Sequence, residues 1–288
     1  MLSDSTTKSL NYIVNNLNFH FSEDKFESTL KIDKFAPIFF NKNAGGIVAG
    51  GSDNWITNKH INQSVHEPAT IGAFLFIQQN FANRIHTIFD IGALYGYFSL
   101  ISKSMFPQST VFSFEMNPSS YQALCQNISF NKHLAIPATR CINMGLSDRT
   151  IFKQKVSIQN FILKELDESE SEKSSVIDII SIDDYCRVSR FKPDLIKIDV
   201  EGYQAKILPG AMGTIRTNRP IVLLEFDSPP QLNSFNTNNK FIVKSLFDLG
   251  YTCYWCKDQR GFEGGFQKLS YDTFSQDHEI NSLAIFIP

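Results

Sequence analysis

The chain has 288 residues, of which 42% are hydrophobic and 19% charged, and its 27 basic and 29 acidic side chains give a formal net charge of −2. This size permits a large α/β domain whose core needs no disulfide bonds. The near-neutral charge, without a Lys/Arg cluster, argues against a nucleic-acid partner, because such binding needs a concentrated cationic face.

Three further patterns bear on location. No stretch approaches the run of about 20 apolar residues that a membrane span requires. The first residues lack the pattern of a secretory leader. The five cysteines are an odd number spread along the chain, which is typical of reduced thiols rather than of a disulfide framework. We therefore expect a cytoplasmic protein without a membrane span.

Residues 1–66 have the weakest pattern, with a candidate amphipathic helix at 7–17 and a Gly-rich stretch at 43–51. We interpret them as an N-terminal extension that packs on the later core or covers a cleft. Residues 67–288 show a different rhythm, and we assign them to one domain.

From residue 67 onward, helical spacing of apolar residues alternates with short apolar runs. This order predicts an α/β fold with a mostly parallel sheet, helices on both faces and right-handed crossovers. The last two strands could pair antiparallel at the sheet edge, and the acidic segment 163–175 is expected to be a solvated loop or a lid. The expected helices are 67–84, 97–105, 119–131, 203–208 and 240–249, and the expected strands are 86–91, 110–114, 139–144, 151–156, 195–200, 221–226, 251–255 and 282–287.

The first of these strands ends in DIGALYG, residues 90–96. Gly92 and Gly96 let the backbone turn tightly and approach a ligand, and the next helix offers free N–H groups to an anion. Asp90 adds a carboxylate at the same place, and Ala93 and Tyr95 complete the turn. Since the Gly-x-Gly-x-x-Gly of a dinucleotide site is missing, the turn favours a ligand with both an ammonium and a carboxylate, such as the methionine end of S-adenosylmethionine.

The second strand of the series leads into Glu115, Met116 and Asn117. An acidic side chain at the end of this strand can accept hydrogen bonds from both hydroxyls of an adenosine ribose. The alternative is a purely structural role, with a polar side chain such as Asn117 capping the next helix.

The strand LIKIDVE places Lys197, Asp199 and Glu201 on one side. A buried lysine needs a partner, so a contact between Lys197 and Asp199 is expected. Asp199, with Lys197 and Glu201, is our candidate for catalysis or acceptor orientation. Glu225 ends the neighbouring strand and could share a divalent cation with Asp199, but a general base or simple positioning is favoured over a metal.

Several segments resemble, in their order along the chain, the motifs of the FkbM-type S-adenosylmethionine-dependent methyltransferases. The resemblance covers about Glu67 to Asp227 and implies a class I methyltransferase fold, with seven strands of which the last is antiparallel. It also implies methyl transfer, commonly to a hydroxyl of a sugar or polyketide. The segments are FDIGALYGYFSL, FSFEMNPSSYQALCQNISFN, CINMGLSDR, SIDDY and DLIKIDVEGYQAKILPGAMGTIRTNRPIVLLEF.

The resemblance also implies individual roles. Asp90, Gly92 and Gly96 match the methionine turn, and Glu115 matches the ribose acceptor. Ser147 and Asp148 match a segment that borders adenine, and Glu67 matches an acidic position that meets the cofactor amino group. The sequence departs from the family at three positions, with Leu94 in place of Asn, Met116 in place of Pro and Gln204 in place of Glu.

The function predicted from these patterns is O-methylation of a hydroxyl on a sugar or glycosylated metabolite, with a small molecule or glycan as acceptor. Two alternatives stay open: N- or carboxyl methylation of a small metabolite, and a non-catalytic protein that binds S-adenosylmethionine. A dinucleotide-dependent oxidoreductase is disfavoured by the missing third glycine.

Overall fold

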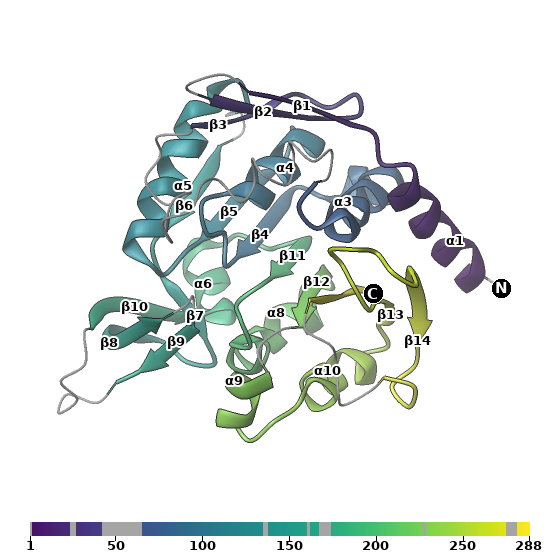
Figure 1. Ribbon diagram of the computed structural model, residues 1–288. Coiled ribbons are helices and arrows are strands. Elements are labelled where there is room, and N and C mark those ends of the chain that lie inside the picture. Colours follow the sequence, from purple (N-terminus) through teal and green to yellow (C-terminus); the bar gives the residue numbers. More distant parts are fainter. Residues whose placement is uncertain are drawn as a thin grey trace.

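The computed structural model describes residues 2–23, 27–41, 65–134, 138–159, 162–166, 174–226, 229–274 and 281–288. Its centre is an eight-stranded sheet with the order β14-β13-β15-β12-β11-β4-β5-β6 (Figure 1). These strands are β4 (Thr87–Ile91), β5 (Thr110–Phe114), β6 (Thr139–Ile142), β11 (Leu195–Ile198), β12 (Ile221–Phe226), β13 (Thr252–Cys256), β14 (Phe266–Leu269) and β15 (Ser282–Ile287).

The direction of the strands confirms the predicted fold class. The five strands from β12 to β6 are parallel neighbours, whereas β15 is antiparallel to both β12 and β13. The sheet has one strand more than expected, because β14 pairs with β13 and takes the edge. The last two predicted strands do pair antiparallel, but the expectation that they form the edge is wrong, because β15 lies inside the sheet.

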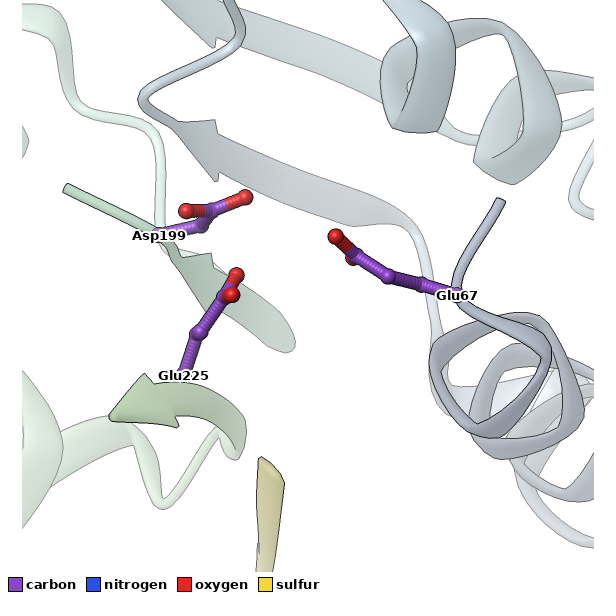
Figure 2. Close-up of side chains that lie close together, drawn as sticks. All are labelled: Glu67, Asp199 and Glu225. Carbon is purple, nitrogen blue, oxygen red and sulfur yellow. The ribbon is translucent and has the colours of Figure 1, made fainter. Parts of the chain in front are cut away.

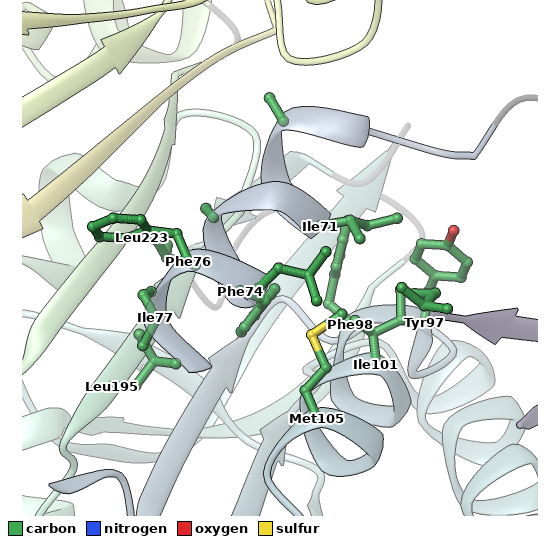
Figure 3. Close-up of a cluster of buried hydrophobic side chains, with 14 of the residues drawn as sticks. Ile71, Phe74, Phe76, Ile77, Tyr97, Phe98, Ile101, Met105, Leu195 and Leu223 are labelled. Carbon is green, nitrogen blue, oxygen red and sulfur yellow. The ribbon is translucent and has the colours of Figure 1, made fainter. Parts of the chain in front are cut away.

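Helices cover both faces of this sheet, as the alternating pattern predicts. They are α3 (Pro68–Phe81), α4 (Tyr97–Met105), α5 (Pro118–Phe130), α6 (Ile182–Ser189), α7 (Gln204–Ile207), α8 (Met212–Asn218), α9 (Pro229–Ser234) and α10 (Asn239–Asp248). Successive residues of β11 serve opposite faces, since Leu195 belongs to one buried apolar cluster and Ile196 to the other. Figure 3 shows the first of these clusters, in which Phe74 of α3 and Phe98 of α4 stack. No helix in the described ranges is long and apolar enough to cross a bilayer.

The N-terminal elements pack on this domain. They are α1 (Leu2–Asn15), β1 (Phe19–Glu23), β2 (Glu27–Ile32) and β3 (Ile38–Asn41), and the three strands form an antiparallel sheet. Helix α1 contacts α3 and β14, and β3 contacts α4 and α5. Leu10, Leu30 and Phe40 are buried in the same apolar cluster as α3 and α4. The described part of the extension thus shares a core with the rest, and the boundary at residue 66 stays a prediction. The Gly-rich stretch 43–51 lies outside the described residues.

A second sheet, of four strands, follows β6 in the chain. Its order is β7-β10-β8-β9, with β7 (Gly145–Ser147), β8 (Ile151–Gln159), β9 (Ile162–Glu165) and β10 (Ser175–Ser181). The strand expected at 151–156 is therefore real but lies outside the main sheet, where it pairs antiparallel with β10 and β9. The loop expected at 163–175 is wrong at both ends, which are strand, and its residues 167–173 lie outside the described residues.

Candidate active site

The turn after β4 has the shape that its glycines predict. Gly92 and Gly96 have φ angles of 77° and 91°, in the left-handed region that glycine tolerates. A Cβ on Gly92 would lie 1.8 Å from the carbonyl oxygen of Asp199, so a larger residue would push β4 and β11 apart. Leu94, where the family has Asn, also has a positive φ of 50°. This conformation is uncommon for a branched side chain and marks local strain.

Glu115 directly follows β5, and its side chain contacts this turn. Its Oε2 accepts a hydrogen bond from the backbone N–H of Leu94 and its Oε1 accepts one from that of Asn117, both at 2.8 Å. The side chain of Asn117 accepts from Ser119 N–H and caps α5, as the structural alternative allows. Burial raises the pKa of Glu115 from its ordinary 4.5 to about 7, although the two backbone donors oppose the rise.

The first of two cavities opens beside Glu115. Its volume is about 120 Å³, and its walls are mostly apolar. Its acidic lining residues are Glu115, Asp199 and Glu201. Its lining is Ile91, Gly92, Leu94, Phe114, Glu115, Met116, Asn117, Met144, Gly145, Leu146, Ile158, Ile179, Asp199, Val200, Glu201, Tyr203 and Ile207.

The second cavity, of about 270 Å³, adjoins the glycine turn and has a more polar lining. It shares Gly92, Leu94 and Asp199 with the first cavity, so the two meet at these residues. Its lining is His66, Glu67, Asp90, Gly92, Ala93, Leu94, Tyr95, Tyr97, Phe98, Asp199, Glu225 and Arg260.

The expected pairing of Lys197 and Asp199 is confirmed. Lys197 Nζ donates to Asp199 Oδ2 at 2.8 Å and lies 3.9 Å from Asp90 Oδ1. Burial alone would lower the pKa of Lys197, but the Asp199 and Asp90 carboxylates raise it above its ordinary value. Burial likewise opposes ionisation of Asp199, yet the Lys197 ammonium holds the pKa of that carboxyl below its usual range. Both groups are therefore charged at neutral pH.

Asp90 itself faces the second cavity and the helix that follows the turn. Its Oδ2 accepts a hydrogen bond from Ser99 Oγ at 2.5 Å, while Oδ1 has no hydrogen-bond donor among the described residues. Burial raises its pKa, and the Lys197 ammonium opposes that rise. Asp90 is thus fixed by α4 on one side and open to the cavity on the other.

Glu225 meets Asp199 as the neighbouring strands predict, and a third carboxylate joins them. Ligand atoms of Glu67, Asp199 and Glu225 all lie within 4.8 Å of one another (Figure 2). Burial raises the pKa of Glu225 well above its ordinary value, and the Asp199 and Glu67 carboxylates raise it further. Glu225 also shares a hydrogen bond with Asp199.

Three further side chains lie beside this cluster. Gln259 is fully buried, and its Nε2 donates to Glu225 Oε1 while its Oε1 accepts from Thr70 at 2.9 Å. His66 Nε2 lies 2.7 Å from Glu67 Oε1, and Arg260 Nε lies 3.7 Å from the same oxygen. Gln259 and Arg260 follow β13 in a stretch without a motif, so only the folded chain reveals their place.

The remaining predicted residues divide into two groups. Ala93, Tyr95, Met116, Asn117 and Glu201 all line one of the cavities. Ser147 and Asp148 instead contact each other, with Ser147 Oγ donating to Asp148 at 3.1 Å.

Asp148 also lies 3.5 Å from Lys206 Nζ. The residues before this pair, Met144, Gly145 and Leu146, are the ones that reach the first cavity.

The period-two alternation predicted from Lys197 does not extend to Glu201, which lies in the turn expected after residue 200. Strand β11 ends at Ile198, and Glu201 follows in a turn with a φ angle of 52°, next to Gly202 at 94°. The alternation of side chains from Lys197 to Glu201 is therefore interrupted, although Glu201 still reaches the first cavity.

Residues 90–253, more than half of the chain, match the family described as Methyltransferase FkbM domain. The chain belongs to the FkbM methyltransferase family. The match confirms that the sequence motifs identify the FkbM family correctly. Glu67 precedes the matched segment, so its role must be argued from the structure.

Solved structures with a similar chain include methyltransferase FkbM from Methylobacillus flagellatus KT, at 15% identity and a TM-score of 0.45 over 76% of this chain and 53% of that one. The chain thus spans about half the length of that protein. A second is an O-methyltransferase from Bacillus cereus in complex with SAH, at 12% identity and a TM-score of 0.40 over 84% and 94% of the two chains. A third is a putative caffeoyl-CoA O-methyltransferase from Staphylococcus aureus, at 14% identity and a TM-score of 0.43 over 80% and 88%. No curated protein matches the chain.

Proposed function

We propose that this FkbM methyltransferase transfers the methyl group of S-adenosylmethionine to a hydroxyl of a sugar or glycosylated metabolite. The observation that carries the proposal is the meeting of two cavities at Gly92, Leu94 and Asp199. A bipartite ligand laid across this junction would have its nucleoside in one cavity and its amino-acid end in the other. Its central atoms would then face Asp199.

The first cavity suits the adenosine half. Phe114, Met116 and Leu146 supply apolar walls, as the adenine ring requires. Glu115 at the strand end is the acceptor for the ribose hydroxyls, and its backbone donors at Leu94 and Asn117 hold the carboxylate in place. Asn117 and Met116 lie next to it in the wall.

The second cavity suits the methionine half. The backbone at Gly92, Ala93 and Tyr95 lines it, and a carboxylate would meet the amino end of α4. Asp90 Oδ1 and Glu67 Oε2 are buried acceptors without a hydrogen-bond donor among the described residues. Either can take the ammonium group, so the residues present fit the cofactor.

The chemistry requires an acceptor oxygen in line with the methyl carbon at about 3 Å, and orientation supplies most of the acceleration. Bound S-adenosylmethionine supplies an electrophilic methyl group. The acceptor oxygen bonds to that carbon, the carbon–sulfur electron pair stays on sulfur, and the hydroxyl proton must leave. Asp199 is ionised and a quarter exposed, and it stands at the cavity junction where it can orient the hydroxyl and accept its proton. Lys197 positions Asp199, and Glu201 lies on the same wall.

Two other functions remain to be separated by experiment: methylation of an amine or carboxylate, and cofactor binding without turnover. The purified protein, with S-adenosylmethionine, is offered matched panels of glycosides, amines and carboxylic acids, and S-adenosylhomocysteine and methylated products are measured by mass spectrometry. We expect the glycosides to yield S-adenosylhomocysteine and a methylated glycoside. Release of S-adenosylhomocysteine only with amines or acids would reject O-methylation. Cofactor binding without release of S-adenosylhomocysteine in any panel would reject catalysis. A cytoplasmic location and the lack of a nucleic-acid partner stay predictions.

A further inference from the structure

We propose that Glu67, Asp199 and Glu225 form a binding site for a divalent metal ion that prefers oxygen ligands, such as Mg²⁺ or Mn²⁺. The three residues come from separate parts of the fold: the approach to α3, the end of β11 and the end of β12. Figure 2 shows their side chains directed toward one another. The proposal does not rest on the proposed function, because metal binding is measured without a methyl acceptor.

The spacing of the oxygens fits a shared cation. One ligand atom from each carboxylate lies within 4.8 Å of the other two. Around Mg²⁺, ligand oxygens sit about 2.1 Å from the ion, and around Ca²⁺ about 2.4 Å, so small side-chain movements bring the three into one coordination sphere. Carboxylate oxygens are the ligands that such hard cations prefer.

A second observation points to a missing cation. Glu67 is 2% exposed, and its Oε2 has no hydrogen-bond donor among the described residues. A buried carboxylate oxygen without a donor or cation is costly. Glu67 also occupies the position before α3 without capping that helix, and its φ of 53° is left-handed. The backbone at Glu67 thus takes an uncommon conformation, and this residue lines the second cavity.

The charges near the cluster favour a divalent over a monovalent cation. The second cavity holds four carboxylates, those of Glu67, Asp90, Asp199 and Glu225. Two permanent cations face them: Lys197, which contacts Asp199, and Arg260, which contacts Glu67 and is 43% exposed. Taken as ionised, the carboxylates exceed these cations by two charges, which one divalent ion balances.

The ammonium of the cofactor is the competing cation. It carries one charge and needs only one of the carboxylates, and Asp90 lies closest to the glycine turn that would hold the methionine end. Asp90 can therefore serve the ammonium while Glu67, Asp199 and Glu225 hold the metal. On this arrangement the two ligands bind together rather than in competition.

The test uses the full chain, stripped with a chelator, and titrates Mn²⁺ by electron paramagnetic resonance at pH 8 without cofactor. We expect one bound Mn²⁺ per chain, displaced by excess Mg²⁺. The near-isosteric Glu225→Gln and Glu67→Gln should each weaken binding by about tenfold or more, since even an indirect ligand partner is worth that much. Asp248→Asn, which changes an exposed carboxylate paired with Lys244, is the matched control and should bind as the wild type does.

Three results would overturn the site. One is no Mn²⁺ bound at about 1 mM, a concentration at which even weak oxygen-ligand sites fill. Another is Mn²⁺ binding that both Gln variants retain unchanged. The third is loss of bound Mn²⁺ when S-adenosylmethionine is added, which would assign the cluster to the cofactor ammonium. Thermal unfolding shows whether each variant is folded. Because the two Gln substitutions lie in different parts of the fold, one variant still tests the site if the other fails to fold.

Discussion

The ammonium of Lys197 lies 2.8 Å from the carboxylate of Asp199, two residues later, although the Lys197 side chain is only 4% exposed. The lysine projects from the middle of β11 toward α4, where its ammonium also lies 4.6 Å from the ring centre of Phe98. Its charge is thus stabilised only by the groups that it contacts inside the protein. The pair fixes the carboxylate that stands where the two cavities meet.

Replacing Lys197 by Met should destabilise the fold strongly. The substitution leaves Asp199 and Asp90 without their buried cation, and breaking such a pair costs about 3–5 kcal/mol. Urea unfolding measures the difference. Lys244→Met removes an exposed ion pair with Asp248 and should cost far less, because a solvent-exposed ion pair contributes little to stability. Equal losses for the two variants would show that Lys197 is not a structural cation.

Asp199→Asn should slow methyl transfer far more than it weakens cofactor binding. Loss of a general base lowers the rate by about 10²–10⁴-fold, whereas the cofactor contacts at Glu115 and the glycine turn remain. Single-turnover kinetics gives the rate and calorimetry gives the affinity for S-adenosylmethionine. A rate equal to that of the wild type would confine Asp199 to a structural role.

Glu115→Gln should weaken the binding of S-adenosylhomocysteine. The amide removes the charged acceptor and presents an N–H₂ group to the N–H donors of Leu94 or Asn117. Hydrogen bonds to a charged group contribute about 1.5–3 kcal/mol. Calorimetry with the wild type and with the exposed control Asp248→Asn gives the difference, and an unchanged affinity would remove Glu115 from the ribose site.

Cofactor affinity should fall as the pH is lowered through 7. Burial raises the pKa of Glu115 to about 7 in the free protein. Below that pH its carboxyl must therefore lose a proton before it can accept hydrogen bonds from both ribose hydroxyls. Well below pH 7, the affinity for the cofactor should fall by about tenfold per pH unit. The stability of the free protein runs the other way: the contribution of Glu115 is full below pH 4.5 and is lost as the pH rises through 7.

The nearby carboxyl of Asp90 also titrates with a raised pKa, so the slope must be assigned by difference. Affinities of wild type and Glu115→Gln are compared between pH 6 and 8. The affinity of Glu115→Gln should depend less steeply on pH than that of the wild type. Parallel curves of affinity against pH would contradict the role of Glu115.

Gln204→Met should stabilise the protein. Gln204 is 1% exposed, and neither atom of its amide has a hydrogen-bond partner among the described residues. A buried unsatisfied polar group costs about 1–3 kcal/mol, which a methionine of similar volume avoids. Gln259→Met is the matched control, because that buried amide bonds Glu225 and Thr70 and its loss should destabilise. Thermal unfolding decides, and a lower Tm for Gln204→Met would refute the argument.

Local patterns predicted a large part of the fold. The glycine turn at 90–96, the acid at Glu115 and the pairing of Lys197 with Asp199 all depend on neighbours in the chain or on strand periodicity. Strand β14 was missed because FQKL is only four residues long. The strands of the second sheet were missed or misplaced because periodicity shows that a segment is extended but not which sheet it joins.

The sequence by itself determined the fold class, the glycine turn after β4 and the carboxylates at the strand ends, because strand and helix periods and glycine turns are properties of short segments. Only the tertiary structure brought Glu67 against Asp199 and Glu225, and Gln259 and Arg260 beside them. These residues lie on distant parts of the chain, and their meeting depends on where β15 enters the sheet and on how α3 packs. No local pattern encodes those long-range contacts, since they arise from burial of the whole core.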